Sequence, residues 1–129
     1  MITLATLEDA TPQEVFDQAA RHLLTQMKKS ATLVKGRTWC EYRGPDGLKC
    51  VAGCFISDTE YNKNMDDHGD ETGWGEMVAD GTFPTTPHTR LMVSLQTVHD
   101  MHEPDAWKAK LKELAFRYSL GTRVLKEFP

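Results

Sequence analysis

Two cysteines and two histidines are the residues of this chain whose types and spacing could hold a metal ion. Cys50 and Cys54 are separated by three residues, and His99 and His102 by two. Two thiolates and two imidazoles make a tetrahedral zinc site when the segments that carry them pack together. The spacing is not that of a standard zinc knuckle, and cysteine is also a small apolar residue that is commonly buried. Two interpretations stay open. The four side chains bind zinc, which is the one cofactor to consider, or they have structural roles alone.

The same residues offer little for catalysis. His99 and His102 are each followed by an acid, but neighbours on a helix point about 100° apart and do not face each other. A nucleophilic thiol needs a nearby cation or helix start, and no cysteine-hydrolase signature surrounds any of the three cysteines. Nucleophile-elbow, phosphate-loop, Rossmann and zinc-protease motifs are missing from the sequence. We expect a non-enzymatic protein, with a small zinc- or thiol-dependent enzyme built on Cys50, Cys54, His99 and His102 as the alternative.

Acidic residues in the middle of the chain are the second group with chemical potential. Residues 58–80 contain eight acids and one lysine, a net charge of −7 in a chain whose total is −4. The order of these acids does not fit an EF-hand calcium loop. One interpretation is a solvated loop, and the other is a surface that engages a basic groove of a partner protein. The candidate partner-binding residues are four acids and two aromatics: Asp66, Asp67, Asp70, Glu71, Tyr61 and Trp74.

Length and charge exclude several classes of protein. The 129 residues have room for a single domain over residues 1–129. Binding to duplex nucleic acid requires a concentrated basic face, so nucleic acid is not expected as a partner. No apolar run approaches the roughly 20 residues of a membrane helix, and the first residues lack the pattern of a secretory signal. We expect a cytoplasmic protein with reduced cysteines and no membrane contact, whose oligomeric state the sequence leaves open.

Amphipathic helices are expected to position these residues. Thr11-Pro12-Gln13-Glu14 is a capping box with proline at the first helical position, and apolar residues follow at spacings of three and four to about Lys29. Thr86-Pro87 starts a second helix, which ends before Pro104. A third helix has Asp105 in its first turn, where an acid suits the positive end of the helix dipole. A short helix is also expected between residues 72 and 81.

Residues 39–52 predict a β-hairpin. Pro45-Asp46-Gly47 lies between two runs of β-forming residues, where proline presets φ and glycine accepts a positive φ. The apolar run 51–56 that follows should enter the core, but it is too short to distinguish strand from helix. The expected fold class is α+β, mainly α, with about four amphipathic helices packed against this one hairpin.

The hairpin segment resembles a family of small bacteriophage and prophage proteins. The similarity rests on Tyr42-Arg43-Gly44-Pro45-Asp46-Gly47-Leu48-Lys49-Cys50-Val51-Ala52-Gly53-Cys54-Phe55-Ile56, and it extends to residues 11–17, Leu95-Gln96, Val98-His99-Asp100 and Trp107. That family usually reads Ala-Val-Gly where this chain has Val51-Ala52-Gly53, a volume-conserving exchange. The resemblance carries over no catalytic residues. It implies a phage-encoded accessory protein, and such proteins often bind and block host proteins, including CRISPR and other defence complexes.

Overall fold

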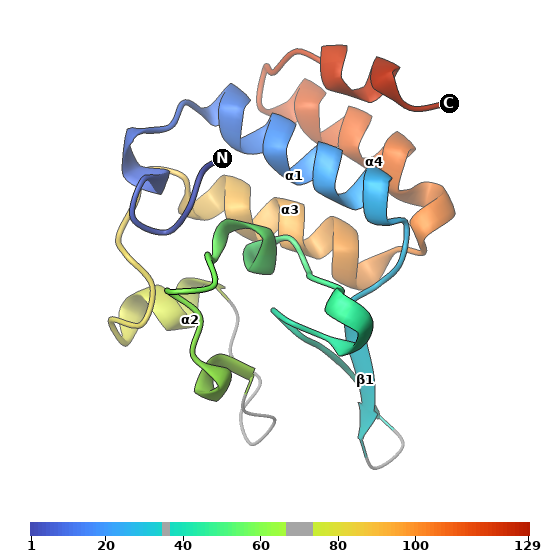
Figure 1. Cartoon of the computed structure of the whole chain (residues 1–129). Coiled ribbons are helices and arrows are strands. Elements are labelled where there is room, and N and C mark those ends of the chain that lie inside the picture. The colour runs from blue at the N-terminus through green and yellow to red at the C-terminus, as the bar shows by residue number, and fades with distance from the viewer. Residues whose placement is uncertain (35–36, 67–73) are drawn as a thin grey trace.

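Helices make up most of this computed structural model, which describes residues 1–34, 37–66 and 74–129 (Figure 1). The α-helices are α1 (Pro12–Gln26), α2 (Trp74–Ala79), α3 (Thr89–Met101) and α4 (Pro104–Arg117). The described part also contains 3₁₀ helices at Leu7–Asp9, Pro45–Gly47, Ala52–Phe55 (η3), Lys63–Asp66 (η4) and Arg123–Glu127. None of the described helices has the length and apolar composition that crossing a bilayer would require.

The predicted capping box starts α1. The Thr11 hydroxyl accepts the Glu14 N–H at 3.1 Å, and the Glu14 carboxylate accepts the Thr11 N–H at 2.8 Å. Two of the amides that a helix start leaves without partners are thereby satisfied. The helix ends at Gln26, short of the predicted Lys29, because Met27 adopts a left-handed conformation with φ of 51°.

The next two predicted long helices form an antiparallel pair. α4 begins at Pro104 with Asp105 in its first turn, as predicted, and α3 ends at Met101, before that proline. The Tyr118 hydroxyl, just beyond α4, lies 2.8 Å from the Ser94 hydroxyl and donates to the Arg90 carbonyl at 3.2 Å. The end of α4 therefore lies against the start of α3 (Figure 1).

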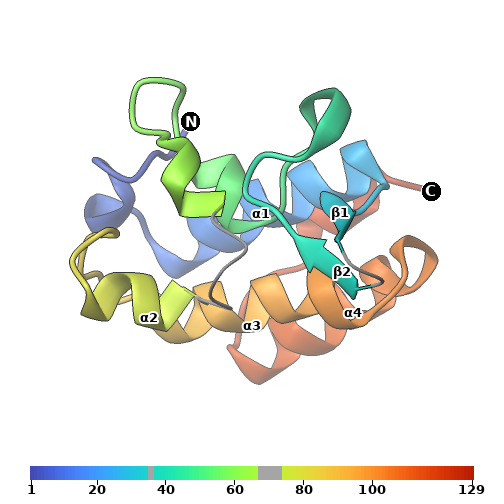
Figure 2. The same cartoon turned by 90° about the horizontal axis from the view of Figure 1, so that it is seen from below.

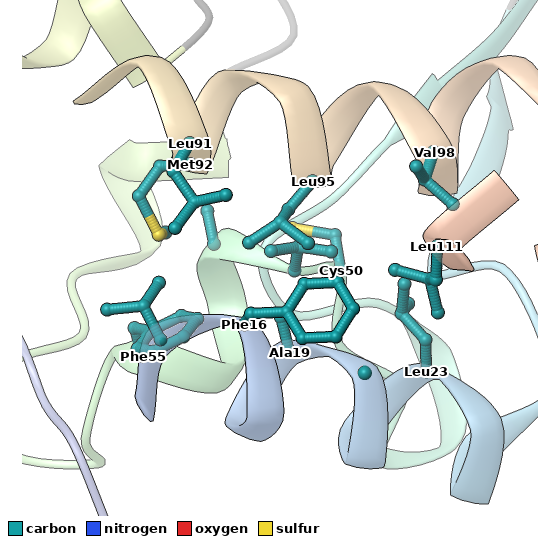
Figure 3. Packing of buried hydrophobic residues seen from close by; sticks show 14 of the residues in the cluster. Phe16, Ala19, Leu23, Cys50, Phe55, Leu91, Met92, Leu95, Val98 and Leu111 are labelled. Carbon is teal, nitrogen blue, oxygen red and sulfur yellow. The ribbon is translucent and has the colours of Figure 1, made fainter. Parts of the chain in front are cut away.

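The core lies between α1, α3, α4 and η3. Phe16 and Leu23 of α1 meet Leu95 of α3 and Leu111 of α4, and Phe55 of η3 closes the cluster (Figure 3). All five side chains are fully buried. Burying a side chain of this size stabilises a fold by about 1.5–3 kcal/mol, so the inner faces of the helices provide the main driving force for folding.

The β-hairpin predicted over residues 39–52 is wrong, and with it the α+β class that rested on it. The described strands are β1 (Ala31–Val34) and β2 (Arg37–Cys40), which pair antiparallel with Ala31 opposite Cys40 (Figure 2). Residue 40 therefore pairs with the chain that precedes it and not with the chain that follows. The run 51–56 is helical, since η3 covers Ala52–Phe55, and the protein is mainly α.

Competing hydrogen bonds explain why the predicted strands do not pair. The Glu41 N–H donates to the Ser30 carbonyl at 2.8 Å, and the Ser30 hydroxyl donates to the Glu41 carbonyl at 2.7 Å. On the other side of the turn, side chains of α1 bind both backbone groups of Lys49. The turn itself forms, with the Gly44 N–H donating to the Leu48 carbonyl at 2.8 Å. Pro45-Asp46-Gly47 therefore predicted the turn correctly, but the runs on either side of it do not pair as strands.

Candidate functional site

Asp66, predicted to face a partner, is hydrogen-bonded within the fold. Its carboxylate accepts the Tyr42 N–H at 2.7 Å, the Arg43 N–H at 3.2 Å and the Tyr61 hydroxyl at 2.6 Å. Hydrogen bonds to an ionised acceptor are roughly twice as strong as neutral ones. Asp66 therefore fixes η4 against the corner of the chain at residues 42–43.

Arg43 strengthens the same junction. Its guanidinium pairs with Asp58 at 2.8 Å, donates to the Ile56 carbonyl at 3.0 Å and lies 4.6 Å from the centre of the Tyr61 ring. The Asp58 side chain is 88% exposed, so this ion pair contributes little to stability. The contacts with Ile56 and Tyr61 hold the Arg43 side chain in place. The sequence offered no signal for this arrangement, because no spacing rule links residue 43 to residues 56–61.

A second acid of the run is also structural. The Glu60 carboxylate accepts the backbone N–H groups of Ser57 at 2.9 Å, Ala5 at 2.9 Å and Leu4 at 3.3 Å. Burial raises the pKa of Glu60, but these hydrogen bonds outweigh it and leave the pKa below its ordinary value. The carboxylate thus joins the N-terminal segment to the turn at residues 57–60.

Trp74 does not lie on the predicted partner-facing surface. Its side chain is 2% exposed at the start of α2, and its ring packs on Phe83 with the centroids 4.5 Å apart. The Phe83 ring in turn meets the edge of Tyr42 at 5.5 Å. The indole N–H has no hydrogen-bond partner among the described residues. Trp74 therefore anchors α2, which lies beside α3 (Figure 2), to the core.

The remaining acids of the run divide into two groups. Asp67, Asp70 and Glu71 lie outside the described residues. Glu76 on α2 and Asp80 just after it are exposed. Asp80 accepts the Thr82 N–H at 2.9 Å, whereas Glu76 has no hydrogen-bond or ion-pair partner in the described part of the chain. The solvent-facing acids that the structure places are therefore Asp58, Glu76 and Asp80.

The four predicted zinc ligands occupy separate environments. Cys50 is buried, and its sulfur accepts the Gly53 N–H at 3.4 Å. Cys54 is partly buried beside α1, and His102 caps the end of α3. Within the described residues, no three His, Cys, Asp or Glu side chains gather as a metal-ion site needs. The zinc site stays a prediction that elemental analysis of the purified protein would test.

Both ring nitrogens of His99 are engaged inside the fold. Nε2 accepts the Ser30 N–H at 3.0 Å, so the proton lies on Nδ1, which donates to the Asp100 carboxylate at 2.7 Å. The ring is fully buried and stacks on Trp107 with the centroids 5.6 Å apart. A metal ion or a substrate at Nε2 would have to displace the Ser30 amide.

Slow thiol chemistry is expected at Cys50 and Cys54. Burial raises the pKa of both thiols above the ordinary value, which removes the reactive thiolate at neutral pH. We expect iodoacetamide at pH 7.5 to alkylate both at least ~10-fold more slowly in the native protein than in urea, as measured by peptide mass spectrometry that separates them from Cys40. Equal rates at Cys54 in the two conditions would restore a thiol-dependent enzyme as a candidate.

A cleft of about 810 Å³ lies between α1 and the segment of residues 47–58, and Met1 and Thr3 also line it. Gln18, His22 and Gln26 of α1 line it, one helical turn apart, and they bind the backbone of that segment. Gln18 donates to the Cys54 carbonyl at 3.2 Å, while His22 and Gln26 each lie 2.8 Å from the Lys49 carbonyl. Sequence reasoning missed this cleft. The signal was the polar stripe at four-residue spacing along the edge of the apolar face of α1.

Comparisons with known proteins bring no further residues to these sites. No protein-family model, curated protein or solved structure matched the chain. The roles of the residues above are therefore assigned from their geometry. The resemblance to bacteriophage and prophage proteins stays a prediction from the sequence.

Proposed function

We propose that the protein is a phage-encoded accessory protein that binds and inhibits a host protein in the host cytoplasm, without catalysis. Its partner has a basic surface, and a defence complex such as a CRISPR effector fits this proposal. The resemblance to small phage and prophage proteins supports the phage origin. The net charge of −7 over residues 58–80 supports a basic partner, because complementary charge steers association and selects the partner.

The observation that carries the proposal is that some acids of residues 58–80 bind groups within the fold, whereas others are exposed to solvent. Asp66 and Glu60 use their carboxylates to fix the acid-rich segment to the rest of the fold. Glu76 and Asp80 project from α2, which Trp74 and Phe83 anchor to the core. Acids on a fixed framework lose little conformational entropy on binding, so a larger part of the charge attraction appears as affinity.

The state of the reactive groups favours binding over catalysis. The thiols of Cys50 and Cys54 are kept protonated by burial, and His99 uses both ring nitrogens within the fold. Catalytic acids, bases and nucleophiles need accessible groups whose pKa lies near the working pH. These thiols and this imidazole do not meet that requirement.

The test compares two triple variants that each remove three negative charges. The first, Asp70→Asn with Glu71→Gln and Glu76→Gln, weakens the acidic run without touching Asp66 or Glu60. The second neutralises the exposed acids Glu8, Glu103 and Glu113, which lie outside the run. In affinity purification from a bacterial lysate, we expect the wild type and the second variant to retain one stoichiometric partner, and the first to retain at least ~10-fold less.

Salt provides an independent readout. Raising the ionic strength from about 0.1 M to about 1 M shortens the Debye length from about 10 Å to about 3 Å, and it should release the partner. Equal retention by both variants would contradict the role of the acidic run. A stable oligomer in sedimentation, with no lysate partner at all, would replace the proposal by self-association.

A further inference from the structure

The cleft beside α1 has the size and the fixed walls of a small-molecule site. Its volume of about 810 Å³ falls within the roughly 300–1,000 Å³ typical of such sites. The Lys49 backbone, at the centre of one wall, donates to Gln26 at 3.0 Å and accepts from Gln26 and His22. The walls expose more apolar than polar surface. The cleft is therefore preformed and largely apolar.

Two of the charged groups that line the cleft, Arg21 and Asp58, have partners of opposite charge. Arg21, one of the lining residues, forms two parallel hydrogen bonds to Glu127 at 3.0 and 2.9 Å. Asp58 on the opposite wall pairs with Arg43. The ammonium of Lys49 has no ion-pair or hydrogen-bond partner within the described part of the chain. Two lining cations, the Lys49 ammonium and the α-ammonium of Met1, thus have no paired opposite charge among the described residues.

The Lys49 ammonium lies close to two other lining groups. Burial lowers the pKa of His22, and the Lys49 charge lowers it further, while the same charge lowers that of the Cys54 thiol against the larger effect of burial. The imidazole is therefore neutral at pH 7. Because its Nε2 donates to the Lys49 carbonyl, Nδ1 is left as an acceptor. The cleft thus offers the Lys49 cation beside a neutral acceptor.

We infer that this cleft binds a small organic acid with an apolar body, whose single negative charge pairs with Lys49. Met1 is fully exposed, so its α-ammonium stays in water, and a monoanion therefore matches the Lys49 ammonium, while an apolar body matches the walls. A hydrogen-bond donor on the ligand can reach His22 Nδ1. The inference does not depend on the proposed function, because only Asp58 of the solvent-facing acids lines the cleft, whereas Glu76 and Asp80 lie on and next to α2.

Two fluorescent probes that differ only in charge test the site. Anilinonaphthalene sulfonate carries one negative charge, and N-phenyl-1-naphthylamine is the same molecule without the sulfonate. We expect Lys49→Gln to weaken the anionic probe about tenfold and to leave the neutral probe unchanged. Lys112→Gln, which removes an exposed lysine of α4, should change neither. Octanoate should displace the anionic probe, and 1-octanol should not.

A second variant tests the location. Thr25 is exposed on α1 and lines the cleft, so Thr25→Trp should fill the space and abolish binding of both probes. Binding that survives Thr25→Trp places the probe elsewhere and overturns the inference. Equal losses of the two probes in Lys49→Gln, or equal displacement by octanoate and octanol, overturn the role of charge. Displacement by acetyl-trileucine but not by octanoate would identify a peptide carboxylate and reject the small acid.

Discussion

Gly53→Ala is expected to destabilise the folded protein by about 3 kcal/mol or more. A Cβ at residue 53 would collide with the backbone carbonyl oxygen of Tyr42. A backbone atom cannot rotate away, so the corner at residues 42–43 would have to leave Asp66, or η3 would have to leave the core. Unfolding in urea, followed by circular dichroism, measures the loss as a lower midpoint at unchanged slope.

The control is the same substitution at Gly75. This glycine is exposed within α2, and a Cβ there would meet none of the described atoms within 4 Å. Gly75→Ala should stabilise the protein by about 0.5–1 kcal/mol, because alanine loses less backbone entropy in a helix. The predicted close packing at Gly53 would be refuted if both alanine variants unfolded at or above the wild-type midpoint.

The long helices could be predicted because their signals are local. For α1, the capping residues Thr11 and Glu14 and the apolar stripe belong to one continuous segment. For α4, Pro104 and Asp105 mark the start within two residues. No partner from another part of the chain is needed to read such patterns. The structure differs from them in the end of α1, at Gln26, and in the start of α3, at Thr89 and not at the predicted Thr86-Pro87.

The hairpin could not be predicted in the same way, because a strand must choose a partner. Residue 40 had plausible partners on both sides, and the choice depended on the Ser30 hydroxyl and on side chains of α1. A signal for the actual pairing was present in the sequence. Thr32 and Val34 precede the pair Lys35-Gly36 in the sequence, β-forming residues follow it, and a glycine-containing pair between two such runs favours a hairpin.

The candidate site could likewise be predicted only in part from the sequence. The sequence identified a segment rich in acids, but it could not show which carboxylates face water. Asp58 and Asp66 are the same type of residue, yet the Asp58 side chain is exposed and the Asp66 carboxylate accepts two backbone N–H groups. The burial of Trp74 was easier to predict from the sequence, because Trp74 precedes Met77 by three residues. Both side chains are buried on the inner face of α2.

Asp66→Asn is expected to lower the free energy of unfolding by about 2 kcal/mol, although asparagine keeps the shape of the side chain. The amide has one oxygen where the carboxylate has two. Its NH₂ group would face either the Tyr42 N–H or both the Arg43 N–H and the Tyr61 hydroxyl, so at least one backbone N–H loses its acceptor and the others keep only a neutral one. Urea unfolding measures the change, and Glu76→Gln, at an exposed acid whose carboxylate has no partner among the described residues, should stay within about 0.5 kcal/mol of the wild type.

A double-mutant cycle with Tyr61→Phe separates a structural role of Asp66 from a role in partner binding. Tyr61→Phe removes the hydroxyl that donates to Asp66 at 2.6 Å and should cost about 1 kcal/mol. If the two side chains act through this bond, the double variant should lose less stability than the two single variants together. Additive losses would mean that the bond contributes nothing. An Asp66→Asn variant with wild-type stability that no longer retains the partner would return Asp66 to the binding surface and reject its structural assignment.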